Sequence, residues 1–162
     1  MAHQIVEPEE AQRGLVVLGI RRGGEALARR LLTAIAEIAP EIPGLGFLNI
    51  NLYRDDDVAH ELPESEIRTE ITGKTVVIVD DVLYTGRTVR AALDAVTDLG
   101  RPNAIRLAVL VDRGLRELPV QADYVGRFVP TSRREHIDVV LAPQPSNDDV
   151  VALIPNEDRA AT

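Results

Sequence analysis

Two adjacent carboxylates end an apolar run in the stretch VVIVDDVLYTGRT, residues 76–88. Apolar residues precede Asp80 and Asp81, and a loop of hydroxyl-bearing and glycine residues follows them. Neighbouring negative charges at the end of a buried strand repel each other unless hydroxyl groups or cations bind them. The pair therefore suits the vicinal hydroxyls of a sugar, with Mg²⁺ available to bridge to phosphate oxygens. A merely solvated strand end would explain neither the pairing nor the loop.

The loop after the carboxylates has the composition of a phosphate site. It runs into a predicted helix that starts near Arg87, and a helix N-terminus presents unpaired N–H groups and a positive dipole end. Gly86 lets the backbone approach a ligand, while Thr85 and Thr88 add hydroxyl donors. The spacing and lysine of a Walker A loop are absent. T-G-x-T alone is more simply a helix cap at Thr85, but beside two carboxylates it predicts a sugar phosphate site.

Alternating strand and helix patterns must position these groups. Strands are predicted at 15–20, 46–53, 75–79, 105–111, 122–130, 137–143 and 149–155, and helices at 25–38 and 87–100. This order predicts one α/β domain with a mainly parallel sheet and helices on both faces. Ligands of such sheets bind at the carboxyl ends of the strands, where the chain places RRGG (21–24), the paired carboxylates and DRG (112–114). The Arg29–Arg30 pair is expected on the solvated face of its helix.

The composition sets outer limits on function. The chain has 162 residues, 45% of them apolar and only 3% aromatic, which predicts one domain with an aliphatic core. Cysteine is absent, so disulfides and thiolate metal sites are excluded. A net charge of −8 argues against indiscriminate nucleic-acid binding but leaves room for a local basic patch. No apolar stretch reaches the roughly 18 residues of a membrane span, and no signal-peptide pattern is present. We expect a cytoplasmic protein without a membrane partner.

The carboxylate-and-threonine stretch resembles the phosphoribosyl pyrophosphate (PRPP) signature of type I phosphoribosyltransferases. Together with NLYRDDD (51–57), LAVLVDRG (107–114), RELP (116–119), ADYVG (122–126) and VPTSRRE (129–135), it is similar to the PyrR family over most of the chain. The resemblance implies a type I phosphoribosyltransferase fold with a small hood. It implies a single domain over 1–162, with a core at about 14–130, a lid at about 54–70, and hood and C-terminal strands at about 126–157.

The resemblance also implies a reaction and its residues. PyrR proteins make UMP and pyrophosphate from uracil and PRPP with Mg²⁺. Asp80 and Asp81 would hold the ribose hydroxyls and, with pyrophosphate, the Mg²⁺. The loop Arg21-Arg22-Gly23 would carry pyrophosphate, although the family commonly reads Lys/His-Thr-Arg-Gly where this chain has Arg21-Arg22-Gly23-Gly24. Arg113 and the segment at Val129 would lie by the base. The PRPP and nucleotide loop would comprise Val82, Leu83, Tyr84, Thr85, Gly86, Arg87 and Thr88.

A second role implied by the resemblance is regulatory. PyrR proteins bind the leader of pyrimidine-operon messenger RNA through a basic surface on a dimer, and uridine nucleotides such as UMP and UTP strengthen that binding. His3, Arg116 and Arg127 match basic positions of this surface. Leu115 and Gln121 replace polar or basic residues there, so weaker RNA binding is expected. Residues 1–7 resemble the end of the family's first helix, so a shortened RNA face is also expected.

Three hypotheses follow. The chain is a uracil phosphoribosyltransferase that also regulates transcription by attenuation, as a homodimer or higher oligomer. Alternatively, the chain is an RNA-binding regulator that uses the pocket only to sense UMP, UTP or PRPP, or a nucleotide sensor with weak or no RNA binding. Alternatively, the enzyme acts on another base, because the PRPP loop alone does not select uracil. A nucleophilic mechanism is not expected, since cysteine and a G-x-S-x-G serine are absent.

Overall fold

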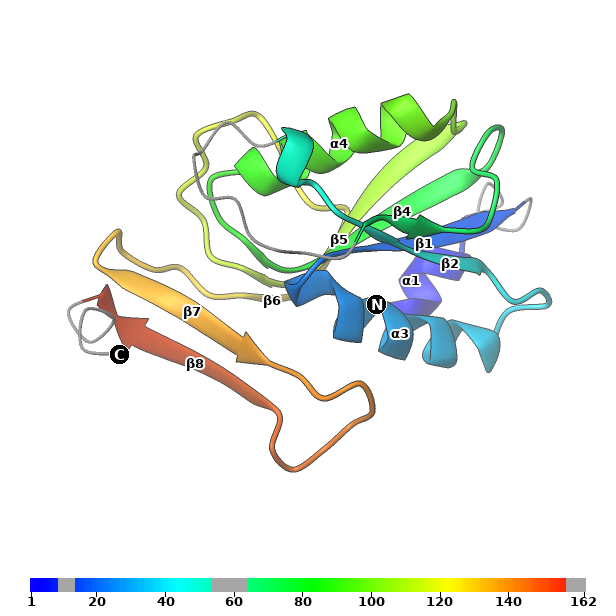
Figure 1. Cartoon of the computed structure of the whole chain (residues 1–162). Coiled ribbons are helices and arrows are strands. Elements are labelled where there is room, and N and C mark those ends of the chain that lie inside the picture. Colours follow the sequence, from blue (N-terminus) through cyan, green and yellow to red (C-terminus); the bar gives the residue numbers. More distant parts are fainter. Residues whose placement is uncertain (9–13, 54–63, 157–162) are drawn as a thin grey trace.

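The computed structural model describes residues 1–8, 14–53 and 64–156 (Figure 1). The helices are α1 (Ala2–Val6), α3 (Gly23–Ala36), the short 3₁₀ turn η1 (Asn51–Tyr53) and α4 (Arg87–Leu99). The strands are β1 (Leu15–Ile20), β2 (Gly44–Leu48), β3 (Glu66–Ile67), β4 (Thr75–Leu83), β5 (Ala104–Asp112), β6 (Tyr124–Phe128), β7 (Glu135–Val140) and β8 (Val150–Pro155).

Within the described part of the chain, a six-stranded sheet has the order β3-β2-β1-β4-β5-β6. Every pairing in it is parallel except that of the short edge strand β3, which runs antiparallel to β2. The predicted α/β class and mainly parallel sheet are therefore confirmed. Parallel strands lie in register from their starts, so β1, β4 and β5 all end at the same edge, as the sequence required.

Side chains alternate between two apolar cores because the strands are buried on both faces. Val16, Leu18 and Ile78 belong to the core that includes Val89 and Val96 of α4. The intervening strand residues belong to the other core, which α3 covers. Figure 1 shows α4 on one face of the sheet and α3 with α1 on the other. The helices thus fix the sheet from both sides and leave its carboxyl edge for the site.

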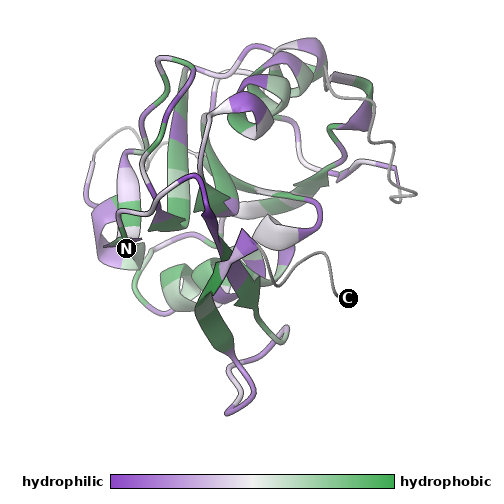
Figure 2. Ribbon diagram, turned by 90° about the vertical axis from the view of Figure 1, so that its left-hand side faces the viewer, coloured by the Kyte–Doolittle hydropathy of each residue, from purple (hydrophilic) through white to green (hydrophobic). Residues whose placement is uncertain are grey.

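β7 and β8 form a separate antiparallel hairpin, paired from Glu135–Pro155 to Val140–Val150. It extends along the side of the molecule below β6 in Figure 1. Much of its ribbon has the colour of hydrophobic residues in Figure 2, and Val140 and Leu153 are at least half exposed. No helix in the described ranges is both long and apolar enough to cross a bilayer.

Two predicted boundaries are wrong in ways that matter for the site. β4 continues to Leu83, so Asp80 and Asp81 lie inside the strand rather than after it. The strand predicted at 46–53 ends at Leu48, because the Asn49 side chain accepts a hydrogen bond from the Asn51 N–H (3.0 Å) and turns the chain. Of the predicted lid, 54–63 lies outside the described residues, and 64–70 contains β3.

Candidate functional site

The two carboxylates project from the carboxyl end of β4. Asp80 is 6% exposed and Asp81 is half-buried. The Asp81 N–H donates to Asp80 Oδ1 (3.0 Å), and the Val82 N–H donates to Asp81 Oδ1 (2.7 Å). Burial raises the pKa of the Asp81 carboxyl, and the hydrogen bond from Val82 opposes that rise. Because burial penalises the charge, an approaching cation or hydroxyl donor stabilises the pair.

The loop after β1 lies directly against these carboxylates. A Cβ atom at Gly23 would overlap the Asp81 carboxylate, and one at Gly24 would overlap the Val79 carbonyl oxygen. Glycine is therefore required at both positions for the loop to reach β4. The Arg21–Arg22 peptide bond in this loop is cis.

The two arginines of this loop have different surroundings. Arg21 points toward the β2–β3 side, where Nη2 lies 3.5 Å from Glu66 and the guanidinium lies 5.6 Å from the Phe47 ring centroid. Arg22 is exposed and lines a hollow of about 360 Å³ with Gly23 and Asp81. The sequence left open which side chain meets pyrophosphate, and this geometry favours Arg22.

The loop between β4 and α4 surrounds a hollow of about 250 Å³ lined by residues 82–89. Gly86 has φ +95°, a conformation that side-chain-bearing residues rarely adopt. It is the N-cap of α4 and provides no side-chain cap hydrogen bond. Thr85 Oγ1 accepts a long hydrogen bond from the Arg87 N–H, at 3.4 Å. Thr85 is thus at most a weak cap, and the start of α4, a position suited to an anion, lines this hollow.

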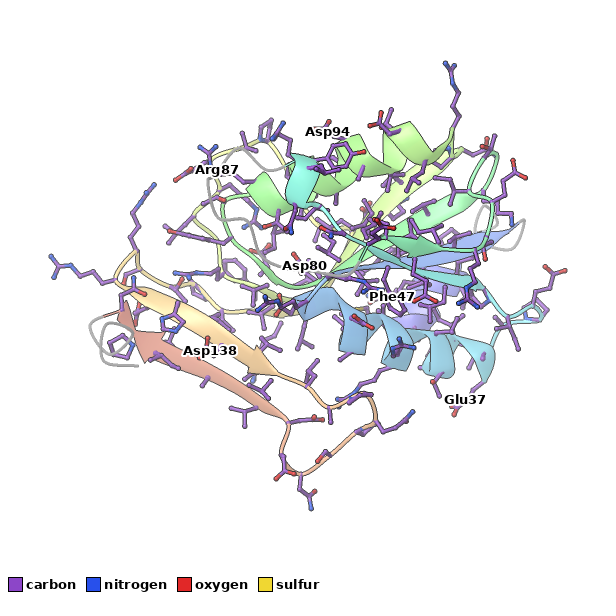
Figure 3. The ribbon with its side chains drawn as sticks, in the orientation of Figure 1. Glu37, Phe47, Asp80, Arg87, Asp94 and Asp138 are labelled. Atoms are coloured by element: carbon purple, nitrogen blue, oxygen red, sulfur yellow. The ribbon has the colours of Figure 1, made fainter. Side chains whose placement is uncertain are left out.

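In the view of Figure 3, Asp80 lies between Arg87, at the start of α4, and Asp138, on β7 of the hairpin. The residues predicted to bind sugar and phosphate therefore lie along one edge of the sheet. A larger hollow, of about 490 Å³, lies at the opposite edge, beside Gly14, Gly44 and Lys74 at the starts of β1, β2 and β4. None of the predicted site residues lines it.

Residues 116–119 pack against the β4–α4 loop, which is the predicted phosphate loop, and hold its backbone by hydrogen bonds. The Glu117 and Leu118 N–H groups donate to the Thr85 carbonyl (2.9 and 3.1 Å). The Arg116 guanidinium donates to the Tyr84 carbonyl (2.9 Å) and forms an ion pair with Asp112 (2.5 Å).

Arg116 also donates to three further carbonyl groups, those of Leu83, Gly114 and Val120. Its side chain is 21% exposed. The predicted RNA contact of Arg116 stays a prediction, but the guanidinium is already held inside the protein.

Arg113 joins the phosphate loop to the hood. It is 5% exposed, and its guanidinium lies 4.2 Å from the centroid of the Tyr84 ring, a cation–π distance. Its Nε donates to Thr131 Oγ1 (2.8 Å), and its Nη2 donates to the Ser132 and Glu135 carbonyls. Arg113 is therefore a buried tether of the hood.

The Val129 N–H donates to the Asp112 carbonyl (2.8 Å), which brings the hood backbone beside the end of β5. This geometry agrees with the predicted place of the base, between Arg113 and the segment at Val129. The assignment of the base to that place stays a prediction.

Two of the predicted RNA residues come from neighbouring elements. His3 on α1 and Arg127 on β6 are exposed. The Met1 side chain lies next to Gly126, 3.2 Å from where a Cβ would be, so α1 starts against β6. Arg116, in contrast, lies behind the phosphate loop.

One expectation about a basic pair is wrong. Arg30 does not lie on a solvated helix face: its guanidinium forms a fork with both carboxylate oxygens of Asp149 (2.7 Å each) in the hairpin turn. Arg29 does lie at the surface, paired with Glu25 (3.1 Å). Helical spacing could not separate the two, because the partner of Arg30 is more than a hundred residues away.

A divalent cation at this site would depend on its substrate. The described residues contain no group of three or more His, Asp or Glu side chains arranged to hold a metal. Asp81 lines the hollow beside Arg22 and Gly23, and Asp80 precedes it on β4. Mg²⁺ is commonly held by one or two carboxylates plus substrate phosphates. The residues present fit Mg²⁺ shared with a bound diphosphate.

Comparisons with known proteins show which proteins this chain resembles. The family described as "Phosphoribosyl transferase domain" matches residues 1–144. A Pelotomaculum thermopropionicum protein named "Bifunctional protein PyrR" is 52% identical over 157 residues, covering 94% of this chain and 87% of that protein. The Elusimicrobium minutum protein of the same name is 47% identical and covers 98% and 90%.

Solved structures show the same fold at lower identity. A Staphylococcus aureus hypoxanthine phosphoribosyltransferase has a TM-score of 0.63 at 22% identity, over 81% of this chain and 70% of that one. A Trypanosoma cruzi hypoxanthine phosphoribosyl transferase has a TM-score of 0.62 at 21% identity, over 91% and 76%. At this identity the likeness shows the fold alone.

Proposed function

The chain belongs to the PyrR proteins of the phosphoribosyltransferase family, and from this premise we propose that it converts uracil and PRPP into UMP and pyrophosphate and regulates pyrimidine genes through messenger RNA. The observation that supports the reaction best is the placement of two half- to fully buried carboxylates between two anion-binding loops. One loop follows β1 and the other precedes α4.

The sugar phosphate is assigned to the β4–α4 side. Asp80 and Asp81 accept hydrogen bonds from the ribose hydroxyls, and the loop from Val82 to Thr88 holds the 5′-phosphate. Backbone N–H groups at a helix N-terminus are suited to a phosphate because they combine donors with the positive end of the dipole. The support from residues 116–118 keeps the loop in one shape, which lowers the ordering cost of binding.

The leaving group is assigned to the β1–α3 loop. Arg22 and the backbone at Gly23 contact pyrophosphate, and the guanidinium fork suits a diphosphate. Mg²⁺, held by the two carboxylates and the diphosphate, would neutralise charge on the leaving group. The chain itself orients C1 of the ribose between the base and the leaving group, and positioning of this kind accounts for much of catalysis without a nucleophile.

The base is assigned to the neighbourhood of Arg113 and the hood segment at Val129. Uracil selection rests on backbone groups there, which form hydrogen bonds with the carbonyl oxygens and ring N–H groups of the base. Family membership favours uracil, and the PRPP half of the site would serve other bases equally well.

RNA regulation is the second activity of the proposal. His3 and Arg127, on adjacent elements, form the basic surface for a pyrimidine-leader RNA, and UMP or UTP in the pocket strengthens that binding. A homodimer or higher homo-oligomer and a cytoplasmic location, both expected of this family, stay predictions.

A panel of bases tests the enzymatic proposal. Pyrophosphate release is measured with PRPP, Mg²⁺ and either uracil, cytosine or hypoxanthine. Turnover with uracil alone supports it, and turnover with hypoxanthine but not uracil would assign the protein to another base. PRPP or UMP binding without turnover would make the pocket a sensor.

A salt titration tests the RNA proposal. Binding of a pyrimidine-leader stem-loop is measured with and without UMP at several salt concentrations. Arg127→Gln is expected to reduce the steepness of the salt dependence by about one unit, because one phosphate contact is lost. Binding that UMP leaves unchanged would contradict the regulatory role.

A further inference from the structure

The β7–β8 hairpin is tied to the domain at two separated points, each by a buried or half-buried arginine. Near the start of β7, Arg113 holds the segment at Thr131–Glu135. Beyond the end of β7, Arg30 of α3 holds the turn that leads into β8. The hairpin therefore runs from the segment at Thr131–Glu135 to the side of α3, as Figure 1 shows.

The second attachment, which we name the Arg30 latch, consists of Arg30, Asp149 and the hairpin turn at 142–149. Besides its fork to Asp149, Arg30 Nη2 donates to the Ala142 carbonyl (2.6 Å) and the Gln144 carbonyl (2.9 Å). Asp149 in turn accepts from the Ala142 N–H (3.0 Å) and the Ser146 N–H (3.2 Å). One guanidinium and one carboxylate thus fix the turn both to α3 and to itself.

The Arg30 latch lies on the same helix as the loop assigned to pyrophosphate. α3 begins at Gly23, in the loop assigned to pyrophosphate, so Arg30 is two helical turns further along the same helix. Val139, Val140 and Leu141 of the hairpin line the same hollow of about 360 Å³ as Arg22, Gly23 and Asp81. Leu141 also packs against the core beneath α3.

The wall formed by 139–141 is apolar, whereas the loop facing it is charged. Apolar residues beside a guanidinium reduce its access to water, and an ionic contact with phosphate becomes stronger as the local dielectric falls. Neither Arg113 nor Val129, at the place assigned to the base, lines this hollow. A change in the wall should therefore affect the leaving-group half of the site more than the base half.

We propose that Arg30 is a positioning residue for the pyrophosphate half of the site, which it serves by holding the hairpin wall 139–141 over Arg22 and Gly23. The inference rests on the proposed phosphoribosyl transfer. Loss of the latch frees the far end of the hairpin while Arg113 keeps its near end attached. Binding of PRPP and pyrophosphate should weaken, and binding of uracil should remain.

The test compares neighbouring residues. Arg30→Gln and Asp149→Asn break the latch. Arg29→Gln changes the adjacent arginine, which pairs with Glu25 on its own helix. Asp148→Asn changes the adjacent aspartate, which lies in the same turn and contacts Ser146: the Ser146 hydroxyl donates to its carboxylate (3.4 Å), and its N–H donates to that hydroxyl (3.1 Å). For each variant, KM for PRPP, KM for uracil and kcat are measured, together with the dissociation constant of magnesium pyrophosphate by calorimetry.

We expect the latch variants to raise KM for PRPP and the dissociation constant of pyrophosphate about tenfold, equivalent to about 1.4 kcal/mol. KM for uracil should stay within about twofold, and both control variants should match the wild type. The double variant should be no worse than the single ones, because both remove the same contact.

Equal constants for Arg30→Gln and Arg29→Gln would overturn the proposal. A fall in kcat and thermal stability with both KM values unchanged would also overturn it, since a purely structural contact behaves in that way. If Arg30→Gln does not fold, the near-isosteric Asp149→Asn decides by the same constants. If the wild type turns over no base, the proposed function fails, and the pyrophosphate dissociation constants still decide the role of the latch.

Discussion

Replacement of Arg116 by methionine tests whether this arginine supports the phosphate loop from inside the protein. The Asp112 side chain that it pairs with is 12% exposed, and it also accepts a hydrogen bond from the Gly114 N–H (2.9 Å). Arg116→Met therefore leaves a nearly buried carboxylate without its cation. It also removes donors from the carbonyl groups at the end of β4, including that of Tyr84.

The size of the expected loss in stability follows from the burial of the Arg116–Asp112 ion pair. Removing one partner of a buried ion pair costs about 3–5 kcal/mol, and the 21% exposure of Arg116 places this pair at the lower end. We expect Arg116→Met to lower the free energy of unfolding by about 3 kcal/mol. For a chain of this size that corresponds to a fall in Tm of roughly 9 °C.

Urea denaturation measures the change, with the midpoint and slope fitted for each variant. Arg127→Met is the matched control, because Arg127 is exposed on β6, and its free energy of unfolding should stay within about 0.5 kcal/mol of wild type. The double variant Asp112→Asn/Arg116→Met should recover part of the loss, because the unpaired charge is gone. If Arg116→Met were as stable as Arg127→Met, the side chain would be a surface contact and the reasoning would be refuted.

Other predictions concern the site and the hairpin. Asp80→Asn/Asp81→Asn should abolish turnover in the pyrophosphate assay while circular dichroism stays unchanged; normal turnover would make the site assignment wrong. Removal of Mg²⁺ by a chelator should stop turnover, and excess Mg²⁺ should restore it. Gly24→Ala should cost about 2 kcal/mol or more in urea denaturation, because the added Cβ overlaps the Val79 carbonyl oxygen; a neutral effect would mean that the loop moves freely. Hydrogen bonds and charge from the guanidinium hold the pKa of the Asp149 carboxyl well below its usual range. A carboxyl whose pKa is lower in the folded than in the unfolded protein stabilises the fold at any pH above the unfolded pKa, near 4. That stabilisation is lost as the pH falls through the folded-state pKa. The stability difference between wild type and Asp149→Asn should thus be constant from pH 7 to 5 and shrink below about pH 4; a difference that grows in acid would contradict the ion pair.

Local sequence patterns predicted the elements that carry the site. The apolar run before Asp80, the glycines after β1 and the hydroxyl loop before α4 each have a short-range signal, and parallel pairing brings them to one edge of the sheet. The type and order of the long strands and helices could be predicted for the same reason. Strand ends were less predictable: the Asn49 side chain that turns the chain after β2 gives only a weak local signal.

The role of individual arginines could not be predicted from the sequence. Arg29 and Arg30 are neighbours of one type, yet one lies at the surface and the other binds a carboxylate 119 positions away. Arg116 matched a basic position of an RNA surface, and that role stays a prediction, but the sequence did not predict that its guanidinium binds Asp112 and backbone carbonyls. Both outcomes depend on how the hairpin and the segment after β5 fold back, which local patterns do not encode.

A crystal structure with UMP bound tests the central claim most directly. The account predicts the 5′-phosphate at the N–H groups of the loop before α4, and the ribose hydroxyls within hydrogen-bonding distance of Asp80 and Asp81. It also predicts the uracil ring between Arg113 and the backbone at Val129. A nucleotide bound elsewhere, such as in the hollow beside Lys74 at the opposite edge of the sheet, would contradict it.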